Sequence, residues 1–344
     1  MSQVNETPNS FSMMLGEVAT ILSAEMAGEN ISVNGISTDS RAIKGGELFL
    51  ALKGPNFDGH QFVKQATEKG AAACLVQDSV DVENRVVVAD THKALGLLAK
   101  AWREKYTKPV IAITGSNGKT TVKEMVASII SQQQTVMATH GNLNNDIGVP
   151  LTLFRLNESF DAAVIEMGAN HSGEIKYLTE IALPDIAIIT NIGTAHLEGF
   201  GSIENTAKAK AEIFQGLSES GTAIINADDS FSELLIKKAA GHKVLTFGLE
   251  NTADIMGQWK SGTVGSKLKV QTPTDNFEVN LKLLGRHNVM NALAAIAASV
   301  AAGFSVQQVI AGLETLKPVA GRLQMKPGIN DSLVIDDTYN ANPT

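Results

Sequence analysis

The spacing of apolar residues changes several times along this chain, and the changes mark its structural segments. Between residues 108 and 250, short runs that are apolar throughout alternate with stretches of helical spacing, the clearest being Val122, Met125, Val126, Ile129 and Ile130. The expected strands are Val110–Ile113, Ala162–Ile165, Ile186–Thr190, Thr222–Asn226 and Lys243–Phe247, with further helices near 173–181, 203–219 and 230–240. Apolar strands that alternate with helices are typical of a parallel sheet covered on both faces. This segment predicts an α/β domain.

A different pattern follows between residues 254 and 283, where apolar and polar residues alternate, as at Phe277, Val279 and Leu281. Such alternation predicts antiparallel strands with one face in water. Two helices, Val289–Ala302 and Val306–Leu316, are expected to complete the domain.

One more apolar strand, Leu333–Ile335, precedes the last residue, Thr344. A single strand cannot bury both of its faces. We therefore expect residues 318–344 to be the start of a truncated domain.

Residues 11–107 predict a small mixed α/β unit. Ser12 is expected to cap a helix that ends at Leu22, because Ser is a favoured N-cap residue. The other expected elements are strands at Glu47–Leu52, Ala73–Val76 and Arg85–Ala89 and a helix at Lys93–Arg103. The predicted domains are 1–107, 108–317 and 318–344.

Composition and charge exclude several classes of function. The 344 residues carry a net charge of −8, from 28 Lys and Arg against 36 Asp and Glu, which gives no basic surface for nucleic acid. No run reaches the roughly 18 apolar residues of a membrane span, and the polar N-terminus lacks a signal-peptide pattern. The single cysteine, Cys74, cannot form an internal disulfide. We expect a cytoplasmic monomer without membrane insertion.

A glycine-containing loop joins the strand at residues 110–113 to the helix that follows it. Its residues are Gly115, Ser116, Asn117, Gly118, Lys119, Thr120 and Thr121. Such a loop turns backbone N–H groups toward phosphate oxygens, and its lysine and following hydroxyl serve the phosphates and Mg²⁺. The loop therefore predicts a magnesium nucleotide. Ile113 stands where the common phosphate loop has its first glycine, which argues against ordinary GTPases and kinases.

Polar residues follow two of the neighbouring strands. Glu166 ends the strand at 162–165, and His196 lies shortly after Thr190. Carboxyl ends of parallel strands face one crevice, where a carboxylate can complete a magnesium site. The pattern alone leaves open whether Glu166 is a ligand or a solvated strand end, and whether His196 binds a metal ion or caps a turn.

These elements together resemble the Mur ligase family, whose members share the shortened G-x-x-G-K-T/S loop. The segment Gly141–Pro150 looks like the family's muropeptide-contacting loop, and Ala207–Phe214 is similar to the stretch with a carbamylated lysine. Gly285–Ala292 matches the segment whose asparagines contact adenine. The resemblance covers nearly the whole chain and implies ATP and Mg²⁺, with two ions, as cofactors. It also implies that the truncated domain at residues 318–344 is Rossmann-like.

The resemblance also implies roles for individual residues. The catalytic and metal-binding set would be Lys119, Thr120, Glu166, His196 and Lys210, with Lys210 carbamylated. Further nucleotide contacts would come from Asn288, Asn291, Arg322 and Asp336, and contacts to a UDP-muropeptide from Ser37, Asp39, Ser40, Arg41, Asn142, Asn144 and Asn145.

Without the resemblance, several of these residues have ordinary structural explanations. Lys208 and Lys210 would be a solvated helix face, residues 37–41 a polar loop, and the two asparagines polar residues at a helix end. Lys210 is preferred over Lys208 because the family's lysine stands three residues before an Ile/aromatic pair, here Ile213 and Phe214.

Within the family, Asp39–Arg41, Gly141–Pro150 and Asp337–Pro343 look most like the member that acts last in the cytoplasm. This likeness implies a ligase of peptidoglycan precursor synthesis. It would pass the γ-phosphoryl of ATP to the tripeptide carboxylate of UDP-N-acetylmuramoyl-tripeptide and join the acyl phosphate to D-alanyl-D-alanine.

Three alternatives stay open. The first is a related enzyme, either another member of the family or a folylpolyglutamate synthase. The second is a fragment that binds nucleotide and muropeptide without ligating. The third is a nucleotide-driven switch, which the loop spacing disfavours.

Overall fold

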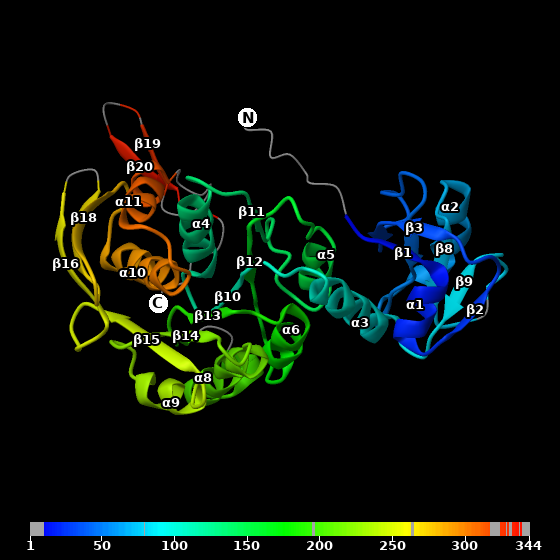
Figure 1. The fold of residues 1–344 in the computed structure, drawn as a ribbon, viewed down its shortest axis with the longest axis horizontal. Helices are drawn as coiled ribbons and strands as arrows, with labels where there is room; N and C mark the ends of the chain where they lie inside the picture. Colours follow the sequence, from blue (N-terminus) through cyan, green and yellow to red (C-terminus); the bar gives the residue numbers. More distant parts are fainter. Residues whose placement is uncertain are drawn as a thin grey trace. The chain divides into compact units, whose positions relative to one another are not determined.

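The computed structural model describes residues 10–78, 80–194, 197–262, 265–316, 324–327, 329, 332–336 and 338, which form two compact units (Figure 1). The first unit holds the described residues up to Thr107 together with His140–Ser159 and Glu180–Leu183. The second holds Lys108–Thr139, Phe160–Thr179 and the chain from Pro184 onward. The functional boundaries at residues 107 and 317 stay predictions.

A five-stranded sheet forms the centre of the first unit. Its order is β2 (Glu25–Ala27), β9 (Arg85–Val87), β8 (Ala73–Val76), β5 (Leu48–Leu50) and β4 (Ile36–Ser37), with only β2 antiparallel among these pairings. The helices are α1 (Leu15–Leu22), α2 (Val63–Glu68), α3 (Thr91–Glu104) and α5 (Gly148–Leu153), with the 3-10 helix η1 (Gly59–Phe62). Two short ribbons pair β1 (Ser12–Met14) with β3 (Ser32–Asn34) and β6 (Lys53–Gly54) with β7 (Phe57–Asp58). The mixed α/β prediction is confirmed.

The prediction that Ser12 caps the first helix is wrong. Ser12 lies in β1 opposite Asn34, and its hydroxyl donates to Asn34 Oδ1 at 2.8 Å. Helix α1 begins at Leu15, and the Gly16 N–H in its first turn donates to the side chain of Asn30 at 2.8 Å. A partner distant in sequence thus replaces the local cap, which a local pattern does not reveal.

The second unit is built on a nine-stranded sheet. Its order is β11 (Val136–Ala138), β12 (Ala162–Glu166), β10 (Val110–Thr114), β13 (Ile186–Ile189), β14 (Thr222–Asn226), β15 (Lys243–Gly248), β16 (Ile255–Ser261), β17 (Ser266–Gln271) and β18 (Asn276–Leu281). Strands β11 to β16 pair in parallel, and β16, β17 and β18 are antiparallel. The predicted parallel sheet and the antiparallel section are confirmed, and the structure joins them into one sheet.

Helices cover this sheet on its two faces (Figure 1). On one face, α4 (Lys119–Ile130) packs against α10 (Arg286–Ala301) and α11 (Val306–Thr315). The apolar stripe predicted for α4 is fully buried there, and alanines of α10 let it lie close to β14, β15 and β16. The remaining helices are α6 (Glu174–Ala182), α7 (Leu197–Phe200), α8 (Ile203–Ala211), η2 (Glu212–Gly216) and α9 (Ser232–Lys238).

Two strands of the second unit, at residues 136–138 and 324–327, lie where the spacing of apolar residues predicts no strand. Edge strand β11 is short, and β19 (Gln324–Pro327) pairs antiparallel with β20 (Leu333–Asp336). The strand predicted at 333–335 is therefore present, and the Rossmann-like identity of the last segment stays a prediction. Among the helices of the described residues, none combines the length and the apolar character needed to cross a membrane.

Candidate nucleotide site

Strand β10 carries the glycine-containing loop to the carboxyl edge of the sheet. It lies between β12 and β13, with Ile113 opposite Glu166 and Thr114 opposite Ile189. Because all three strands are parallel, their carboxyl ends meet at this edge. The loop therefore begins between Glu166 and the segment that follows β13.

Two glycines of the loop hold positions that other residues could not occupy. Gly115 has a φ of +151°, and a Cβ atom there would meet the hydroxyl of Thr190. Gly118 has a φ of +82°, and a Cβ atom there would meet the side-chain oxygen of Asn291. L side chains rarely adopt such backbone conformations. The loop is thus packed between the segment after β13 and helix α10.

The segment after β13, residues 190–192, holds the glycine-containing loop at residues 115–121 in place. We call these two segments the clamp and the phosphate loop. Asn191 accepts the Asn117 N–H through Oδ1 at 2.9 Å and donates from Nδ2 to the Asn117 carbonyl at 3.0 Å. The Thr190 hydroxyl donates to the same carbonyl at 2.6 Å, and the Ser116 N–H donates to the Asn191 carbonyl at 3.0 Å. Because the N-terminus of a helix favours an anion, the N–H groups at the start of α4 are the donors suited to phosphate.

Asp229, in the turn after β14, holds the clamp in place. Its carboxylate accepts the Ile192 N–H at 2.7 Å and the Phe231 N–H at 2.9 Å. Burial raises the pKa of the Asp229 carboxyl, and the two N–H groups partly oppose that rise. Sequence analysis selects neither Asp229 nor Asn191, although each follows an apolar strand that ends at this edge, and that position is the signal that could identify them.

Lys119 begins α4 and stays close to the loop backbone. Its Nζ donates to the carbonyls of Gly115 at 2.8 Å and Ser116 at 3.2 Å. The positive charge is therefore held beside the first turn of α4, whose helix dipole also favours an anion. Thr120 follows in the same turn.

The two lysines of α8 lie in different environments. Lys208 is half exposed and pairs with Glu204 at 2.7 Å. Lys210 is 2% exposed, and its Nζ lies 5.8 Å from the centre of the Phe200 ring. Burial, helped by the charge of Lys119, lowers the pKa of Lys210 to about 7. A substantial share of this amine is therefore neutral near pH 7, as a reaction with CO₂ requires.

The donor set at the edge of the sheet fits a magnesium nucleotide. Glu166 ends β12 with 2% exposure, and Thr120 adds a hydroxyl beside the phosphate loop. Mg²⁺ prefers oxygen ligands and binds through one or two carboxylates together with phosphate oxygens and water. In the part of the chain that the structure describes, no three His, Cys, Asp or Glu side chains are grouped to hold a metal ion by themselves.

Asn288 and Asn291 lie near the start of α10 and are both buried. The side-chain amide of Asn288 donates to the Leu284 carbonyl at 2.9 Å, and that of Asn291 to Asn288 Oδ1 at 3.4 Å. Since Asn291 also lies against Gly118, the structure brings the start of α10 to the phosphate loop. Adenine contact by these asparagines stays a prediction.

The residues predicted to bind the UDP group lie in the first unit. Arg41 and Asp39 form a two-bonded ion pair, with Nε to Oδ1 at 2.9 Å and one terminal nitrogen to Oδ2 at 2.8 Å. Ser37 donates to the Asp39 carbonyl at 3.0 Å. Ser40 is buried and donates to Gln65 at 2.7 Å, and its contact with the UDP group stays a prediction.

The predicted muropeptide loop also groups with the first unit. Asn145 Oδ1 accepts the Gly148 N–H at 2.8 Å, which fixes the start of α5. Asn142 is exposed and Asn144 is half-buried. Substrate contacts by these asparagines stay predictions.

The predicted site also includes His196, Arg322 and Asp336. His196 and Arg322 lie outside the described residues. Asp336 ends β20, where its carboxylate accepts hydrogen bonds from the Thr338 N–H at 3.2 Å and hydroxyl at 2.7 Å.

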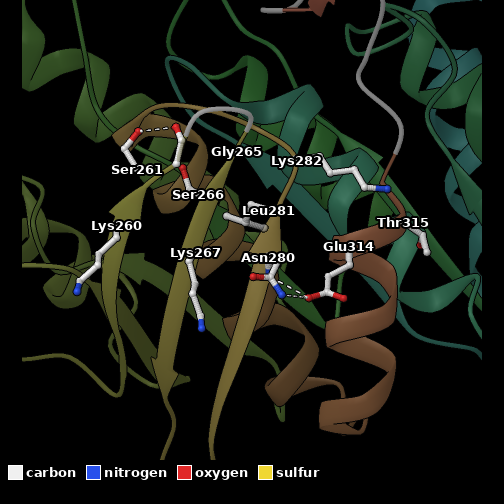
Figure 2. A pocket seen from close by; sticks show the side chains of 11 residues that line it. Lys260, Ser261, Gly265, Ser266, Lys267, Asn280, Leu281, Lys282, Glu314 and Thr315 are labelled. Carbon is white, nitrogen blue, oxygen red and sulfur yellow. Dashed lines mark hydrogen bonds between the residues drawn. The ribbon is translucent and has the colours of Figure 1, made fainter.

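A cavity of about 630 Å³ lies at the ends of β16, β17, β18 and α11 (Figure 2). In Figure 2, Asn280 points at Glu314, to which its side-chain amide donates at 2.9 Å. Lys267 pairs with Glu278 at 2.6 Å. The residues that line this cavity include none of the phosphate loop or of the clamp, so the cavity is separate from the candidate site.

Comparisons with known proteins agree with the geometry. Residues 113–299 match the Mur ligase middle domain, and residues 32–103 match the Mur ligase family catalytic domain. The UDP-N-acetylmuramoyl-tripeptide–D-alanyl-D-alanine ligase of Escherichia coli is 44% identical over 334 residues, which cover 96% of this chain and 74% of that protein.

Solved structures give the same relation. A crystal structure of MurF from Acinetobacter baumannii has a TM-score of 0.93 and 38% identity, and the match covers 97% of this chain and 75% of that one. MurF ligase from Thermotoga maritima in complex with ADP has a TM-score of 0.81 and 30% identity, and covers 90% of this chain and 71% of that one.

Proposed function

Because this chain belongs to the Mur ligase family, we propose that it is an ATP-dependent ligase that joins D-alanyl-D-alanine to UDP-N-acetylmuramoyl-tripeptide. Relatives and a solved structure that bear this activity in their names match almost the whole chain. The proposal places the protein in the synthesis of peptidoglycan precursors, in the cytoplasm.

One observation carries the proposal: two lysines, one of them buried, accompany a buried carboxylate beside a phosphate loop. Lys119 stands at the start of α4, and the pKa of Lys210 is lowered by burial and, to a smaller extent, by the charge of Lys119. Glu166 ends the adjacent strand. A reaction between a triphosphate and a carboxylate must bring two anions together, so fixed positive charge and positioning supply most of the catalysis.

The reaction has two balanced steps. A carboxylate oxygen of the tripeptide attacks the γ-phosphorus of ATP, the bond to the β-phosphate oxygen breaks, and ADP leaves. The amine of D-alanyl-D-alanine then attacks the acyl carbon, loses a proton, and phosphate departs as the amide bond forms. Lys119 and the first-turn N–H groups of α4 would bind the phosphoryl oxygens in the first step.

Magnesium, when bound, would neutralise part of the phosphate charge. Thr120 and Glu166 would hold one ion, and Lys210 as a carbamate would supply ligand oxygens for a second, with His196 beside it. The lowered pKa of Lys210 supports carbamylation, since a neutral amine is the species that reacts with CO₂.

The substrates divide between the two units in this proposal. The UDP group would bind at Ser37–Arg41, where exposed Arg41 and Asp39 offer a cation and an anion. The muropeptide would meet Asn142, Asn144 and Asn145, and adenine would meet Asn288 and Asn291. Arg322 and Asp336 would complete the nucleotide contacts, and the protein would act as a monomer.

Phosphate release by the purified chain tests the proposal. We expect release to require ATP, UDP-N-acetylmuramoyl-tripeptide and D-alanyl-D-alanine together, and to fall at least about a hundredfold in Lys119→Met, because a fixed charge at the phosphoryl group is lost. Lys208→Met serves as the control, since Lys208 is exposed and paired with Glu204. Release without muropeptide would indicate a nucleotide-driven switch. Binding of nucleotide and muropeptide without release would indicate a non-ligating fragment.

A further inference from the structure

Lys123 is a buried cation for which the proposed reaction has no role. It lies one turn after Lys119 in α4 and is 2% exposed. An ammonium group out of water costs free energy unless hydrogen bonds or an ion pair compensate it. Its Nζ donates to the Thr139 carbonyl at 2.7 Å and pairs with Glu124 at 2.9 Å. Thr139 is the buried one of these two partners, so the role of Lys123 is inferred from the contacts of Thr139.

Thr139 connects this lysine to the candidate metal site. It directly follows β11, and its N–H donates to the Val164 carbonyl in β12 at 3.0 Å. The Thr139 hydroxyl accepts the backbone N–H of Glu166 at 2.9 Å. Because β11 ends at Ala138, a side chain takes the place of a further backbone acceptor and holds the last residue of β12.

We propose that Lys123 and Thr139 are positioning residues for the metal-binding carboxylate of Glu166. Lys123 fixes the Thr139 carbonyl, and the hydroxyl of Thr139 fixes the backbone from which the Glu166 side chain extends. This inference rests on the proposed function, in which Glu166 holds magnesium.

In this arrangement, helix α4 positions both the phosphate-binding groups and the metal-binding carboxylate of the proposed site. The first turn of α4 and Lys119 would hold the phosphates, and one turn later Lys123 sets the end of β11 and, through it, Glu166. Thr139 is also the last residue of the second unit before the chain enters the first at His140. The buried ammonium thus holds the backbone at the point where it leaves the sheet.

A matched set of threonine variants tests the proposal. Thr139→Val removes the hydroxyl and keeps the shape of the side chain, whereas Thr139→Ser keeps the hydroxyl. Thr179→Val is the control, because Thr179 is a buried threonine of the same unit whose hydroxyl donates to the Ile213 carbonyl at 2.9 Å. The measurement is the Mg²⁺ concentration that gives half of the maximal gain in ATP affinity, determined by titration of a fluorescent ATP analogue.

We expect Thr139→Val to raise this Mg²⁺ concentration about tenfold, as is usual when a residue that orients a metal ligand is lost. Thr139→Ser and Thr179→Val should keep the wild-type value, and affinity for ATP in EDTA should be unchanged in all three. Lys123→Met should shift the Mg²⁺ dependence in the same direction. A purely structural role would lower the melting temperature without this shift.

Glu166→Gln separates failure of this inference from failure of the proposed function. If Glu166→Gln leaves the Mg²⁺ dependence unchanged, the metal role of Glu166 is wrong, and the inference built on it falls too. If Glu166→Gln weakens Mg²⁺ binding while Thr139→Val behaves like Thr179→Val, the inference is overturned and the proposed function stands. Should Thr139→Val not fold, Lys123→Met carries the test, and an unchanged Mg²⁺ dependence there overturns the inference equally.

Discussion

The two candidate binding regions hold their charged groups in opposite ways. At the phosphate loop, Glu166 and Lys210 are each 2% exposed and come from elements far apart in sequence. In the loop Ser37–Arg41 of the first unit, which we propose binds the UDP group and call the UDP loop, Asp39 and Arg41 are near neighbours in sequence. They pair with each other, and their side chains are 44% and 81% exposed.

This difference has an energetic consequence. A charge kept out of water must be compensated by its surroundings, so a buried site is assembled by the whole fold and costs stability. An exposed ion pair costs little and contributes little. Substitutions at the phosphate loop should therefore change stability and activity together, whereas substitutions at the UDP loop should change substrate binding alone.

Lys210→Met gives the largest expected effect on this contrast. Turnover should fall by about a hundredfold or more, because the group that would carry the carbamate is lost. At the same time the protein should become more stable near pH 7, because a buried ammonium is replaced by an apolar side chain of similar length. Phosphate release and urea unfolding measure the two changes, and Lys208→Met, an exposed lysine of the same helix, should alter neither.

The pH dependence of stability provides a second readout for Lys210. Its pKa is about 7 in the folded protein, against an ordinary value of 10.5. Between these pH values the unfolded chain binds more protons, so the free energy of unfolding should rise with pH by up to about 1.4 kcal/mol per unit. In buffer free of CO₂ and nucleotide, Lys210→Met should lack this rise. The same slope in wild type and variant would show that the fold does not lower the pKa of Lys210.

A smaller effect is expected where the clamp meets the phosphate loop. Asn191→Leu removes both side-chain hydrogen bonds to the Asn117 backbone. We expect a loss of about 1–3 kcal/mol in the free energy of unfolding and about a tenfold loss in ATP affinity. Chemical unfolding and nucleotide titration measure these losses.

Asn84 provides the matched control for the clamp. In the first unit, its side chain accepts the Glu29 N–H at 2.9 Å and donates to the Ala72 carbonyl at 3.3 Å. Asn84→Leu should lower stability and leave ATP affinity unchanged. Equal effects of the two variants on ATP affinity would contradict a specific role for Asn191.

The difference between groups assembled from distant elements and groups that are neighbours in sequence also explains what could be predicted from the sequence. Continuous apolar runs indicate the parallel strands, period-two alternation indicates the antiparallel section, and helical spacing indicates the buried face of α4, because burial follows the geometry of each element. Gly115, Gly118 and Lys119 form a contiguous motif, so the phosphate loop is visible in the sequence as well. Contacts such as Lys123 with Thr139, or Asn191 with Asn117, depend on the order of strands in the sheet, which no local pattern encodes.

Ser12 and Ser40 illustrate the same limit in the first unit. Each is a polar residue in a suitable local pattern, one for a helix cap and one for a ligand contact. Ser12 pairs with Asn34 in β3 instead of capping α1, whereas Ser40 donates to Gln65 in α2 and its ligand contact stays a prediction. Partners distant in sequence determine what each hydroxyl does, and the local pattern cannot rank them.

Arg41→Ala carries the smallest expected effect on stability. The Arg41 guanidinium lowers the pKa of Asp39 to about 2, from an ordinary value of 3.8. A lowered carboxyl pKa stabilises the fold above pH 3.8, and this contribution is lost as the pH falls toward 2. Because the pair is exposed, the contribution is small and decreases further with added salt. Wild type and Arg41→Ala should thus unfold at nearly the same urea concentration at pH 7.

Steady-state kinetics decide whether this exposed pair acts in binding. Arg41→Ala should raise KM for UDP-N-acetylmuramoyl-tripeptide with little change in kcat, because Arg41 lies in the UDP loop and would contact a part of the substrate that does not react. Lys93→Ala is the control, since Lys93 is an exposed lysine of the same unit that lies 3.9 Å from Asp90. If Arg41→Ala lowers stability as Asn84→Leu does, the exposed pair serves the fold and the two regions no longer differ in kind. If Arg41→Ala leaves KM unchanged, the exposed pair has no role in substrate binding.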